Sequence, residues 1–260
     1  MQLSDARAKA QILYDARRTR VAIAPFTDAE PALNMTDGYA IQRELVSLLL
    51  ADGDRIVGHK VGATSKAMQQ LVGLDSPDYG PVLASTVFHD GDVIALDQFI
   101  APKVEAEIAF VLGTRLQGPG VTDAQARAAI AEVVGAMEIV DSRIADWRIK
   151  LADTVADLAS NGAIVVGERR VPGDGIDFRD IAMTLSRGQT LVDSGSGEAV
   201  LGDPVTVLTW LANVLGADGV ALEPGHLIMT GALHAAVPLA PGETYTAEYD
   251  LLGSVTVTAQ

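Results

Sequence analysis

The residues best suited to do chemistry together lie between Pro102 and Phe110, where apolar and polar side chains alternate. Alternation of this kind predicts a strand, and successive side chains of a strand point to opposite faces. Glu105 and Glu107 therefore share one face, with their carboxylates roughly 6–7 Å apart, which is two strand rises. Like charges at this separation repel each other, and solvent, a proton or a bound cation relieves that repulsion. The opposite face of the strand is apolar and is predicted to face the core.

A third carboxylate, Glu138, lies in the apolar run from Gly135 to Val140. A buried charge has to be paired, protonated or bound to a metal. Three glutamates in a chain without cysteine make an all-oxygen ligand set, which suits Mg²⁺ or Mn²⁺ better than zinc. The alternative for Glu105 and Glu107 is a solvated polar face, because such alternation is common in antiparallel sheets.

Lys60 and Asp78 are further candidates, and each also has an ordinary structural interpretation. Lys60 lies in a predicted strand, residues 55–62, that contains two glycines, and glycine in a strand often marks a bulge or a close approach to the backbone. A lysine among valines and glycines either extends to water or is partly buried. Asp78 lies in a turn-rich segment where aspartate is a common structural choice. In a regular strand His59 points away from Lys60.

Three other residues could contact a substrate or could only shape the backbone. Ser160 follows a short helix predicted over residues 153–159, and Gly162 suits its C-cap. Thr230 and Gly231 end a predicted strand, where they offer backbone N–H groups or simply form a turn. There is no GxSxG motif to support serine-hydrolase chemistry. Metal-site spacing is missing among the remaining histidines, for which we expect structural or surface roles: His89, His226 and His234.

These side chains are positioned by a chain in which helices come first and strands dominate after residue 54. Helices are expected at residues 3–18, 36–51 with Thr36 as N-cap, 65–71, 122 to about 134, 153–159 and 203–215. Strands are expected at residues 55–62, 85–96, 104–113, from about 135 to 140, 163–167, 227–230, 244–250 and 254–258, with a hairpin over 181–193 and a connection over 168–180. No glycine-rich nucleotide loop follows a strand. The pattern predicts an α+β fold with a mixed, largely antiparallel sheet rather than a doubly wound one.

Length and composition narrow the class of protein further. With 260 residues and 48% hydrophobic residues, the chain can form a large core, which we divide into a helical N-terminal segment, 1–54, and a main domain, 55–260. A net charge of −15 argues against nucleic acid but not against a small anionic substrate, because a bound divalent cation inverts the local field. We find no membrane span and no signal segment, and the lack of cysteine suits the cytoplasm.

Several segments, in this order, resemble the 2-keto-4-pentenoate hydratase and 4-oxalocrotonate decarboxylase family of the fumarylacetoacetate hydrolase superfamily. They are residues 58–65 (GHKVGATS), 77–80 (PDYG), 102–112 (PKVEAEIAFVL), 142–147 (SRIADW), 153–157 (DTVAD) and 230–232 (TGA). The resemblance covers nearly the whole chain, and the strand with two glutamates followed by a third is its most specific part. It implies a rolled, mixed β-sheet domain with flanking helices and a smaller N-terminal segment.

The resemblance also implies roles for individual residues. Lys60 and Asp78 match general acid–base residues of the family, and Ser160 matches a substrate-contacting position. Leu158 departs from the family pattern, which has an amide there. A metal, usually magnesium or manganese, is implied on the residues that match its carboxylate ligands: Glu105, Glu107 and Glu138.

The resemblance extends to function and partners. It implies a homo-oligomer, and we expect a downstream aldolase as a further partner. Our hypothesis is hydration of a 2-hydroxy-alka-2,4-dienoate to a 4-hydroxy-2-oxo acid in aromatic catabolism. A 2-oxo-3-hexenedioate decarboxylase is the nearest alternative, in which Arg143, Arg148 or Lys150 would meet a second carboxylate. The short path from Trp147 to Asp153 favours a monocarboxylate.

Two further alternatives remain open at the level of sequence. One is hydrolytic cleavage of an acylpyruvate, for which His59 is the only nearby histidine that could serve as base. The other is a non-catalytic partner subunit, which would have no need of a buried anionic cluster.

Overall fold

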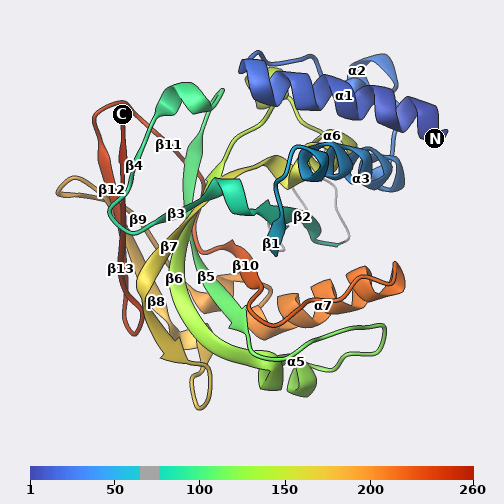
Figure 1. Ribbon diagram of the computed structural model, residues 1–260. Helices are drawn as coiled ribbons and strands as arrows, with labels where there is room; N and C mark the ends of the chain where they lie inside the picture. Colours follow the sequence, from blue (N-terminus) through green and yellow to red (C-terminus); the bar gives the residue numbers. More distant parts are fainter. Residues whose placement is uncertain (65–75) are drawn as a thin grey trace.

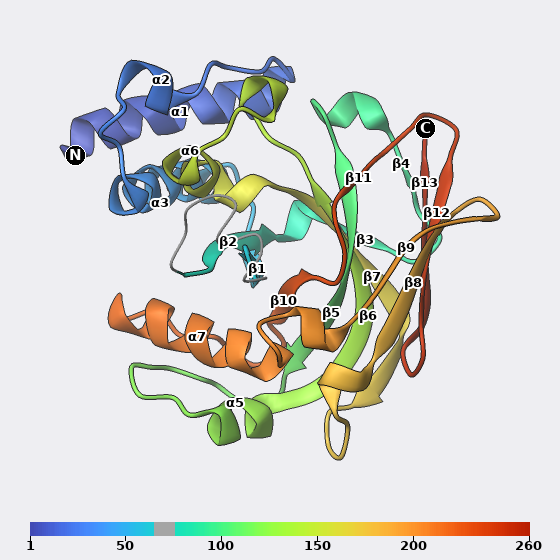
Figure 2. The same ribbon diagram turned by 180° about the vertical axis from the view of Figure 1, so that it is seen from behind.

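The computed structural model describes residues 1–64 and 76–260, so the helix expected at 65–71 lies outside the described residues. Strongly curved strands gather on one side of the molecule and helices on the other (Figure 1). The view from behind shows the same separation (Figure 2). This α+β arrangement of curled, mixed sheets and flanking helices confirms the predicted fold class.

The helices form two groups at opposite ends of the helical side. They are α1 (Leu3–Thr19), α2 (Phe26–Ala29), α3 (Met35–Ala51), α5 (Asp123–Ala129), α6 (Leu151–Ala156) and α7 (Pro204–Ala217). The first three pack near α6, whereas α5 lies beside α7 (Figure 1). The described part of the chain contains no helix long and apolar enough to cross a membrane.

The larger sheet carries the strands that contain the candidate residues. Its strands are β1 (Ile56–Gly62), β2 (Asp78–Leu83), β3 (Val87–His89), β5 (Lys103–Leu112), β6 (Ile130–Val140), β7 (Asn161–Pro172), β10 (Leu227–Ala232) and β11 (Val237–Pro238). Their order is β2-β1-β10-β5-β6-β7-β3, with β11 paired to β5. The β1–β10 and β3–β7 pairs are parallel and the others are antiparallel, as the predicted mixed, largely antiparallel sheet requires.

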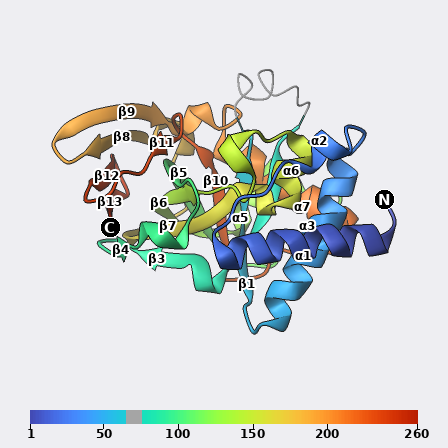
Figure 3. The same ribbon diagram turned by 90° about the horizontal axis from the view of Figure 1, so that it is seen from above.

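The smaller sheet completes the strand side of the molecule. Its strands are β4 (Val93–Ile94), β8 (Ala182–Arg187), β9 (Thr190–Ser196), β12 (Thr244–Tyr249) and β13 (Gly253–Ala259), in the order β4-β13-β12-β8-β9. Seen from above, β8, β9, β12 and β13 lie at the end of the molecule opposite α1 and α3 (Figure 3). The main apolar core joins the two sheets and includes Phe110, Met137 and Tyr245. The apolar face of β5 lies in this core, as predicted.

The N-terminal helices have an apolar cluster of their own. Leu13 of α1 and Leu45 of α3 pack there with Leu83 and Leu158, which belong to the rest of the chain. Inside α3, the buried Gln42 side chain donates to the carbonyl oxygens of Tyr79 and Val155. The helices therefore hold segments that lead to the candidate site, and the domain boundary at residue 54 stays a prediction.

The expected element boundaries were wrong in several places. Asn34, not Thr36, caps α3, since its side chain accepts from the Asp37 N–H. The helix after Thr122 ends at Ala129, and residues up to 134 already belong to β6. Strand β7 extends across Gly162 and on to Pro172, so Gly162 is not a helix C-cap and much of the expected connection is strand. The single strand expected at 85–96 is two short strands, β3 and β4.

The differences at β6 and β7 have a common physical cause. β6 is paired on both sides, with β5 and with β7, over nearly its whole length. Two hydrogen-bonded neighbours favour an extended backbone at positions where local sequence alone is compatible with helix or loop.

Candidate active site

Pairing between β5 and β6 brings the three glutamates together. Glu105 and Glu138 are direct partners across the antiparallel ladder, so their side chains lie on the same face. Glu107 follows on that face two positions along β5. One carboxylate oxygen from each residue lies within 4.8 Å of the other two. Glu107 and Glu138 are each 1% exposed, so this cluster is not a solvated polar face.

Burial gives the cluster unusual electrostatics. Desolvation, reinforced by the charge of Glu138, raises the pKa of Glu105 to about 7. Desolvation and the two neighbouring carboxylates raise the pKa of Glu107 well above its ordinary value. Burial also raises the pKa of Glu138, although Lys60 and Asn161 oppose the shift. Three buried carboxylates cannot all ionise unless their charge is compensated, and a bound divalent cation would compensate it. Their oxygen-only chemistry fits a hard cation.

Two of the three carboxylates, Glu107 and Glu138, are also oriented by neighbouring groups. Glu107 Oε2 accepts a hydrogen bond of 2.8 Å from the Gly231 N–H. Glu138 Oε1 accepts one of 2.8 Å from Asn161 Nδ2 and lies 3.3 Å from Lys60 Nζ. Outer groups of this kind fix the direction of metal-binding side chains.

Lys60 and Asp78 lie beside the cluster, on β1 and at the start of β2. Burial alone would lower the pKa of the Lys60 ammonium, but Glu138 and Asp78 raise it above its usual value. Burial raises the pKa of Asp78 although Lys60 opposes the shift. The Asp78 Oδ1 atom is buried and has no hydrogen-bond partner within the described parts of the chain. An orphaned, buried carboxylate oxygen next to an ammonium group is typical of a functional site.

Gly62 is required by the crowding between these two side chains. A Cβ atom at this position would lie 2.3 Å from Asp78 Oδ1 and 3.2 Å from Lys60 Nζ. The close approach predicted for the glycines of this strand is therefore made, at Gly62, by the side chains of the candidate site.

Ser160 lies near the cluster, in an unusual turn just before Asn161. Its hydroxyl is 3.0 Å from that of Thr154. Leu158, Ala159 and Ser160 all have positive φ, at 56°, 53° and 56°. Left-handed backbone costs roughly 1–2 kcal/mol for each residue that is not glycine, and such strain is concentrated at functional sites. Leu158, where the family has an amide, is buried in the N-terminal apolar cluster.

Thr230 and Gly231 lie at the site, but their polar groups bond within the protein. The Thr230 hydroxyl donates to the Ile108 carbonyl at 2.7 Å, and the Gly231 N–H donates to Glu107. These contacts position β10 and Glu107, and they use the Gly231 N–H, one of the backbone groups that this segment was expected to offer.

Two residues of the site were not found from the sequence. Asn161 orients Glu138 from the position opposite Val140, two residues along β6, and this placement depends on the register of β6 and β7. His234 lines a cavity of about 100 Å³ together with the three glutamates. Its Nε2 accepts from the Ala106 N–H at 2.8 Å, so Nδ1 carries the proton and donates to the Ala235 carbonyl. Neither residue has a spacing signal in the sequence.

The cationic residues considered for a second substrate carboxylate are mostly occupied. Arg143 is buried and bonds to the Asp157 side chain through Nε and its backbone N–H. Arg148 pairs with Asp28 at 3.1 Å on the surface. A different cation, Lys103, lies on the same strand face as Glu105 with its Nζ 4.1 Å from the centre of the Trp147 ring.

His59 is separated from the glutamates. It lines another cavity, between α3 and α7, together with Tyr79 and Leu215. Burial lowers its pKa to about 3, and the nearby His226 contributes. The structure therefore does not bring His59 to the cluster as a base.

Comparisons with known proteins agree with this geometry. The family model of the fumarylacetoacetate (FAA) hydrolase C-terminal domain matches residues 55–260. The chain is 39% identical over 249 residues to a 2-hydroxyhexa-2,4-dienoate hydratase of Comamonas testosteroni, covering 95% of this chain and 94% of that protein. It is 42% identical over 246 residues to a 2-keto-4-pentenoate hydratase of Paraburkholderia xenovorans, covering 95% and 91%.

Solved structures show the same fold. A 4-oxalocrotonate decarboxylase from Pseudomonas putida G7, complexed with magnesium and adipate, superposes with a TM-score of 0.97 at 33% identity, covering 100% of this chain and 99% of that one. A fumarylpyruvate hydrolase from Pseudomonas aeruginosa, in complex with Mn²⁺ and pyruvate, has a TM-score of 0.62 at 17% identity over 77% and 88% of the chains, which is a likeness of fold alone.

Proposed function

This chain belongs to the fumarylacetoacetate hydrolase family, and from that premise we propose that it is a divalent-metal-dependent hydratase. It adds water to a 2-hydroxy-alka-2,4-dienoate of the 2-keto-4-pentenoate type and releases a 4-hydroxy-2-oxo acid, in the catabolism of aromatic compounds. The curated relatives that support this are hydratases at about 40% identity over 95% of the chain. The observation that carries the proposal is the buried convergence of three glutamates beside Lys60 and Asp78.

The residues that would hold the ion are Glu105, Glu107 and Glu138. When bound there, a divalent cation supplies a Lewis acid and a template for a 2-oxo carboxylate. We propose Mg²⁺ or Mn²⁺, because carboxylate oxygens are hard ligands and this chain offers no thiolate. The structurally similar decarboxylase, solved with magnesium, supports the same class of ion.

Lys60 and Asp78 move protons in this proposal. Hydration of a dienol requires a proton to reach carbon during ketonisation and a proton to leave water as it adds at C4. Asp78 Oδ1 is free to accept or return a proton, and the burial that raises its pKa keeps the protonated form accessible. The Lys60 ammonium stabilises nearby negative charge and can donate. General acid–base catalysis of this kind contributes on the order of 10²–10⁴-fold in rate.

Ser160 supports the substrate side of the site, whereas Thr230 and Gly231 act on the metal side. Ser160 offers a buried hydroxyl on a strained turn next to Asn161. We assign Thr230 and Gly231 to the positioning of Glu107, since the Gly231 N–H is bonded to it.

A second candidate function is decarboxylation of a 2-oxo-3-hexenedioate. It is favoured by the TM-score of 0.97 to a decarboxylase solved with adipate, a dicarboxylate. Two of the three cations considered for a second substrate carboxylate are already paired, Arg143 with Asp157 and Arg148 with Asp28, which weakens this alternative.

Product analysis separates the two reactions. The purified chain is incubated with Mg²⁺ and either 2-hydroxypenta-2,4-dienoate or the corresponding six-carbon dicarboxylate, and the products are followed by NMR. We expect a new hydroxyl-bearing carbon at C4 from the monoacid and no carbon dioxide from the diacid. Release of carbon dioxide as the faster reaction would contradict the hydratase assignment.

We further propose that the protein works in the cytoplasm as a homo-oligomer on this small-molecule substrate, with a downstream aldolase as an expected partner. The support is family resemblance. Light scattering on the purified chain tests the oligomer, and co-purification with the aldolase tests the partner.

A further inference from the structure

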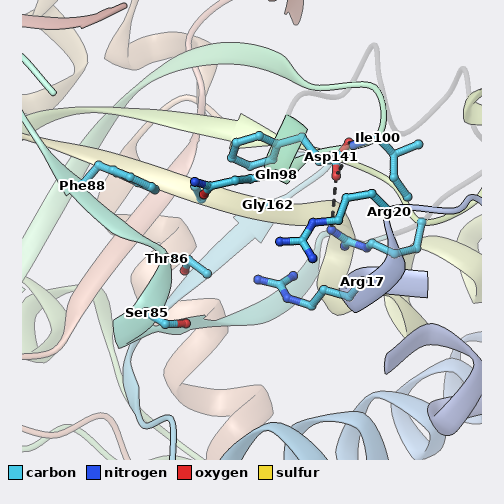
Figure 4. A pocket seen from close by; sticks show the side chains of 12 residues that line it. Arg17, Arg20, Ser85, Thr86, Phe88, Gln98, Ile100, Asp141 and Gly162 are labelled. Atoms are coloured by element: carbon cyan, nitrogen blue, oxygen red, sulfur yellow. Dashed lines mark hydrogen bonds and ion pairs between the residues drawn. The ribbon is translucent and has the colours of Figure 1, made fainter. Parts of the chain in front are cut away.

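A second polar cavity, of about 170 Å³, lies apart from the three glutamates and plays no part in the proposed reaction. It is formed by the end of α1, the segment leading into β3, residues 98–100 and the start of β7. Three guanidinium groups, from Arg17, Arg20 and Arg143, line it, and Figure 4 shows the labelled arginines extending toward the same space. Hydroxyl and amide groups complete the polar part of the lining, from Ser85, Thr86 and Gln98.

The carboxylates near this cavity are already occupied by other groups. Asp141 accepts from the backbone N–H groups of Ile100 and Ala101, at 3.1 and 2.7 Å, and lies 3.9 Å from Arg143 Nη1. Asp157 accepts from the side chain and backbone of Arg143. The carboxylate oxygens of the two aspartates are therefore already hydrogen-bonded, mostly to backbone N–H groups and to Arg143.

Arg17 and Arg20 are left without such a partner. Neither forms an ion pair with a carboxylate anywhere in residues 1–64 or 76–260. Arg17 makes one long hydrogen bond, of 3.4 Å, to the Asn161 carbonyl, and Arg20 donates to the Arg18 carbonyl. Burial, together with the charge of Arg143, lowers the pKa of Arg17 to about 10, although the charges of Asp157, Asp141 and Asp54 oppose the shift. A guanidinium carries five N–H donors, so most of the donors on both side chains can still bind an acceptor.

We propose that this cavity binds a small oxyanion, phosphate or carboxylate, held between the guanidinium groups of Arg17 and Arg20. The planar fork of arginine matches two oxygens of such a group and makes its strongest hydrogen bonds to them. The volume is below the roughly 300–1,000 Å³ of sites for drug-sized ligands, so the ligand is small. The net charge of −15 makes the protein as a whole repel anions. An anion would therefore bind only where cationic side chains are concentrated, as they are in this cavity.

One contact decides which arginine should be changed in a test. Arg17 and Arg143 both donate to the Asn161 carbonyl, while the Asn161 side chain orients Glu138. Substitution of Arg17 would therefore disturb the catalytic site as well. Arg20 is exposed, has no contact with Asn161 and can be replaced without that complication.

The test measures binding of inorganic phosphate, and separately of succinate, to the full chain at constant ionic strength by isothermal titration calorimetry. The proteins are wild type, Arg20→Gln, and Arg7→Gln as the matched control, because Arg7 lies on the same helix with its side chain 75% exposed. We expect one saturable site per chain in wild type and in the control. Loss of charged hydrogen bonds should weaken binding about tenfold or more in Arg20→Gln.

Two results would overturn the proposal. One is the lack of saturable binding in wild type, or an equal affinity in Arg20→Gln. The other is an Arg20→Glu variant that changes the oligomeric state in sedimentation experiments while wild type binds neither anion. That result would show that the cavity receives a carboxylate from a second copy of the chain.

Discussion

At the scale of single residues, the candidate site is defined by charges that the fold brings together against their repulsion. Glu105, Glu107 and Glu138 have raised pKa values because they are buried near one another. A buried cluster of like charges does not by itself stabilise a protein. Such clusters are typical of functional sites, where a bound ligand compensates the charge. Replacement of one carboxylate should therefore separate the effect on stability from the effect on metal binding.

Glu107→Gln tests this separation. The amide keeps an oxygen that can accept from the Gly231 N–H, but it removes one of three mutually repelling charges. We expect the melting temperature of the metal-free protein to stay the same or rise, while Mg²⁺ affinity and turnover each fall by about 100-fold or more, since even outer-shell changes cost 10–100-fold. Calorimetry with and without Mg²⁺ measures both. If Glu105→Gln and Glu107→Gln both bind metal normally, the site is misplaced.

The raised pKa of Glu105 predicts how pH acts on the metal-free protein. The pKa of Glu105 is about 7 in the folded protein, against an ordinary value of 4.5. Between pH 4.5 and pH 7, the folded protein therefore keeps a proton on Glu105 that the unfolded chain has released. Stability contributed by this group is therefore present at low pH and is lost as pH rises from about 4.5 to 7. Metal binding requires the ionised form, so Mg²⁺ affinity should rise over the same window.

Denaturant titrations of the metal-free protein at pH 5 and pH 7 test the expected loss of stability. Mg²⁺ titrations at the same pH values, in buffers of different ionisation enthalpy, test the expected rise in Mg²⁺ affinity and count the protons released. Proton release on Mg²⁺ binding near pH 6 is expected. An affinity that is unchanged between the two pH values would show that the carboxylates are ionised before the metal arrives.

Asp78→Asn tests proton transfer apart from metal binding. The amide has nearly the same shape as the carboxyl group but cannot exchange a proton, so turnover should fall on the order of 10²–10⁴-fold. Mg²⁺ affinity should change little, because Asp78 is not one of the three carboxylates whose oxygens converge. Asp97→Asn, at an exposed position, is the control. Parallel losses of turnover and metal affinity in Asp78→Asn would place Asp78 among the ligands instead.

How well single residues could be predicted depended on how local their signal was. Alternation along one strand was enough to put Glu105 and Glu107 on one face, and an isolated charge in an apolar run was enough to single out Glu138. Asn161 and His234 reach the site through strand register and a turn after β10, which no spacing in the sequence records.

At the scale of elements, β1 and β2 carry Lys60 and Asp78 and are packed so closely that a side chain at Gly62 would displace both groups. Gly62→Ala would place a methyl group 2.3 Å from Asp78 Oδ1. We expect turnover to fall at least tenfold while the protein still folds, because the displaced atoms belong to two side chains of the site. The control is Gly53→Ala, in a turn where φ is 95° and no atom lies within 4 Å of the added Cβ.

The two glycine variants should differ in kind. Gly53→Ala should lower the free energy of unfolding by about 1 kcal/mol through backbone strain alone, with normal turnover per folded molecule. A Gly62→Ala variant with full activity would show that Lys60 and Asp78 adopt another arrangement during catalysis. Turnover assays and denaturation curves, both measured on each variant, distinguish these results.

Element types were predicted better than element ends. The helix expected from residue 203 was confirmed as α7, with Asp203 as its cap and Pro204 at the first helical position, and so was the hairpin, formed by β8 and β9; both follow from local chemistry. The starts of β6 and β7 were missed because their pairing partners, rather than local propensity, set those ends.

At the scale of the whole molecule, two layers of interaction hold the site in place. The main core joins the two sheets and fixes β5 and β6, which carry the glutamates. The N-terminal helices contribute no carboxylate to the cluster, yet their apolar cluster includes Leu83 of β2 and Leu158 of the strained turn. The order of the strands in both sheets could not be deduced from sequence patterns, since those patterns are local, and the family resemblance supplied the architecture.

The most direct test of the account is whether hydration depends on a divalent cation held by the three glutamates. The purified chain is treated with a chelator until no metal remains, and its turnover of 2-hydroxypenta-2,4-dienoate is followed by NMR before and after Mg²⁺ or Mn²⁺ is added. We expect negligible formation of the 4-hydroxy-2-oxo acid without metal and restored formation with it. Equal rates in the two conditions would contradict it.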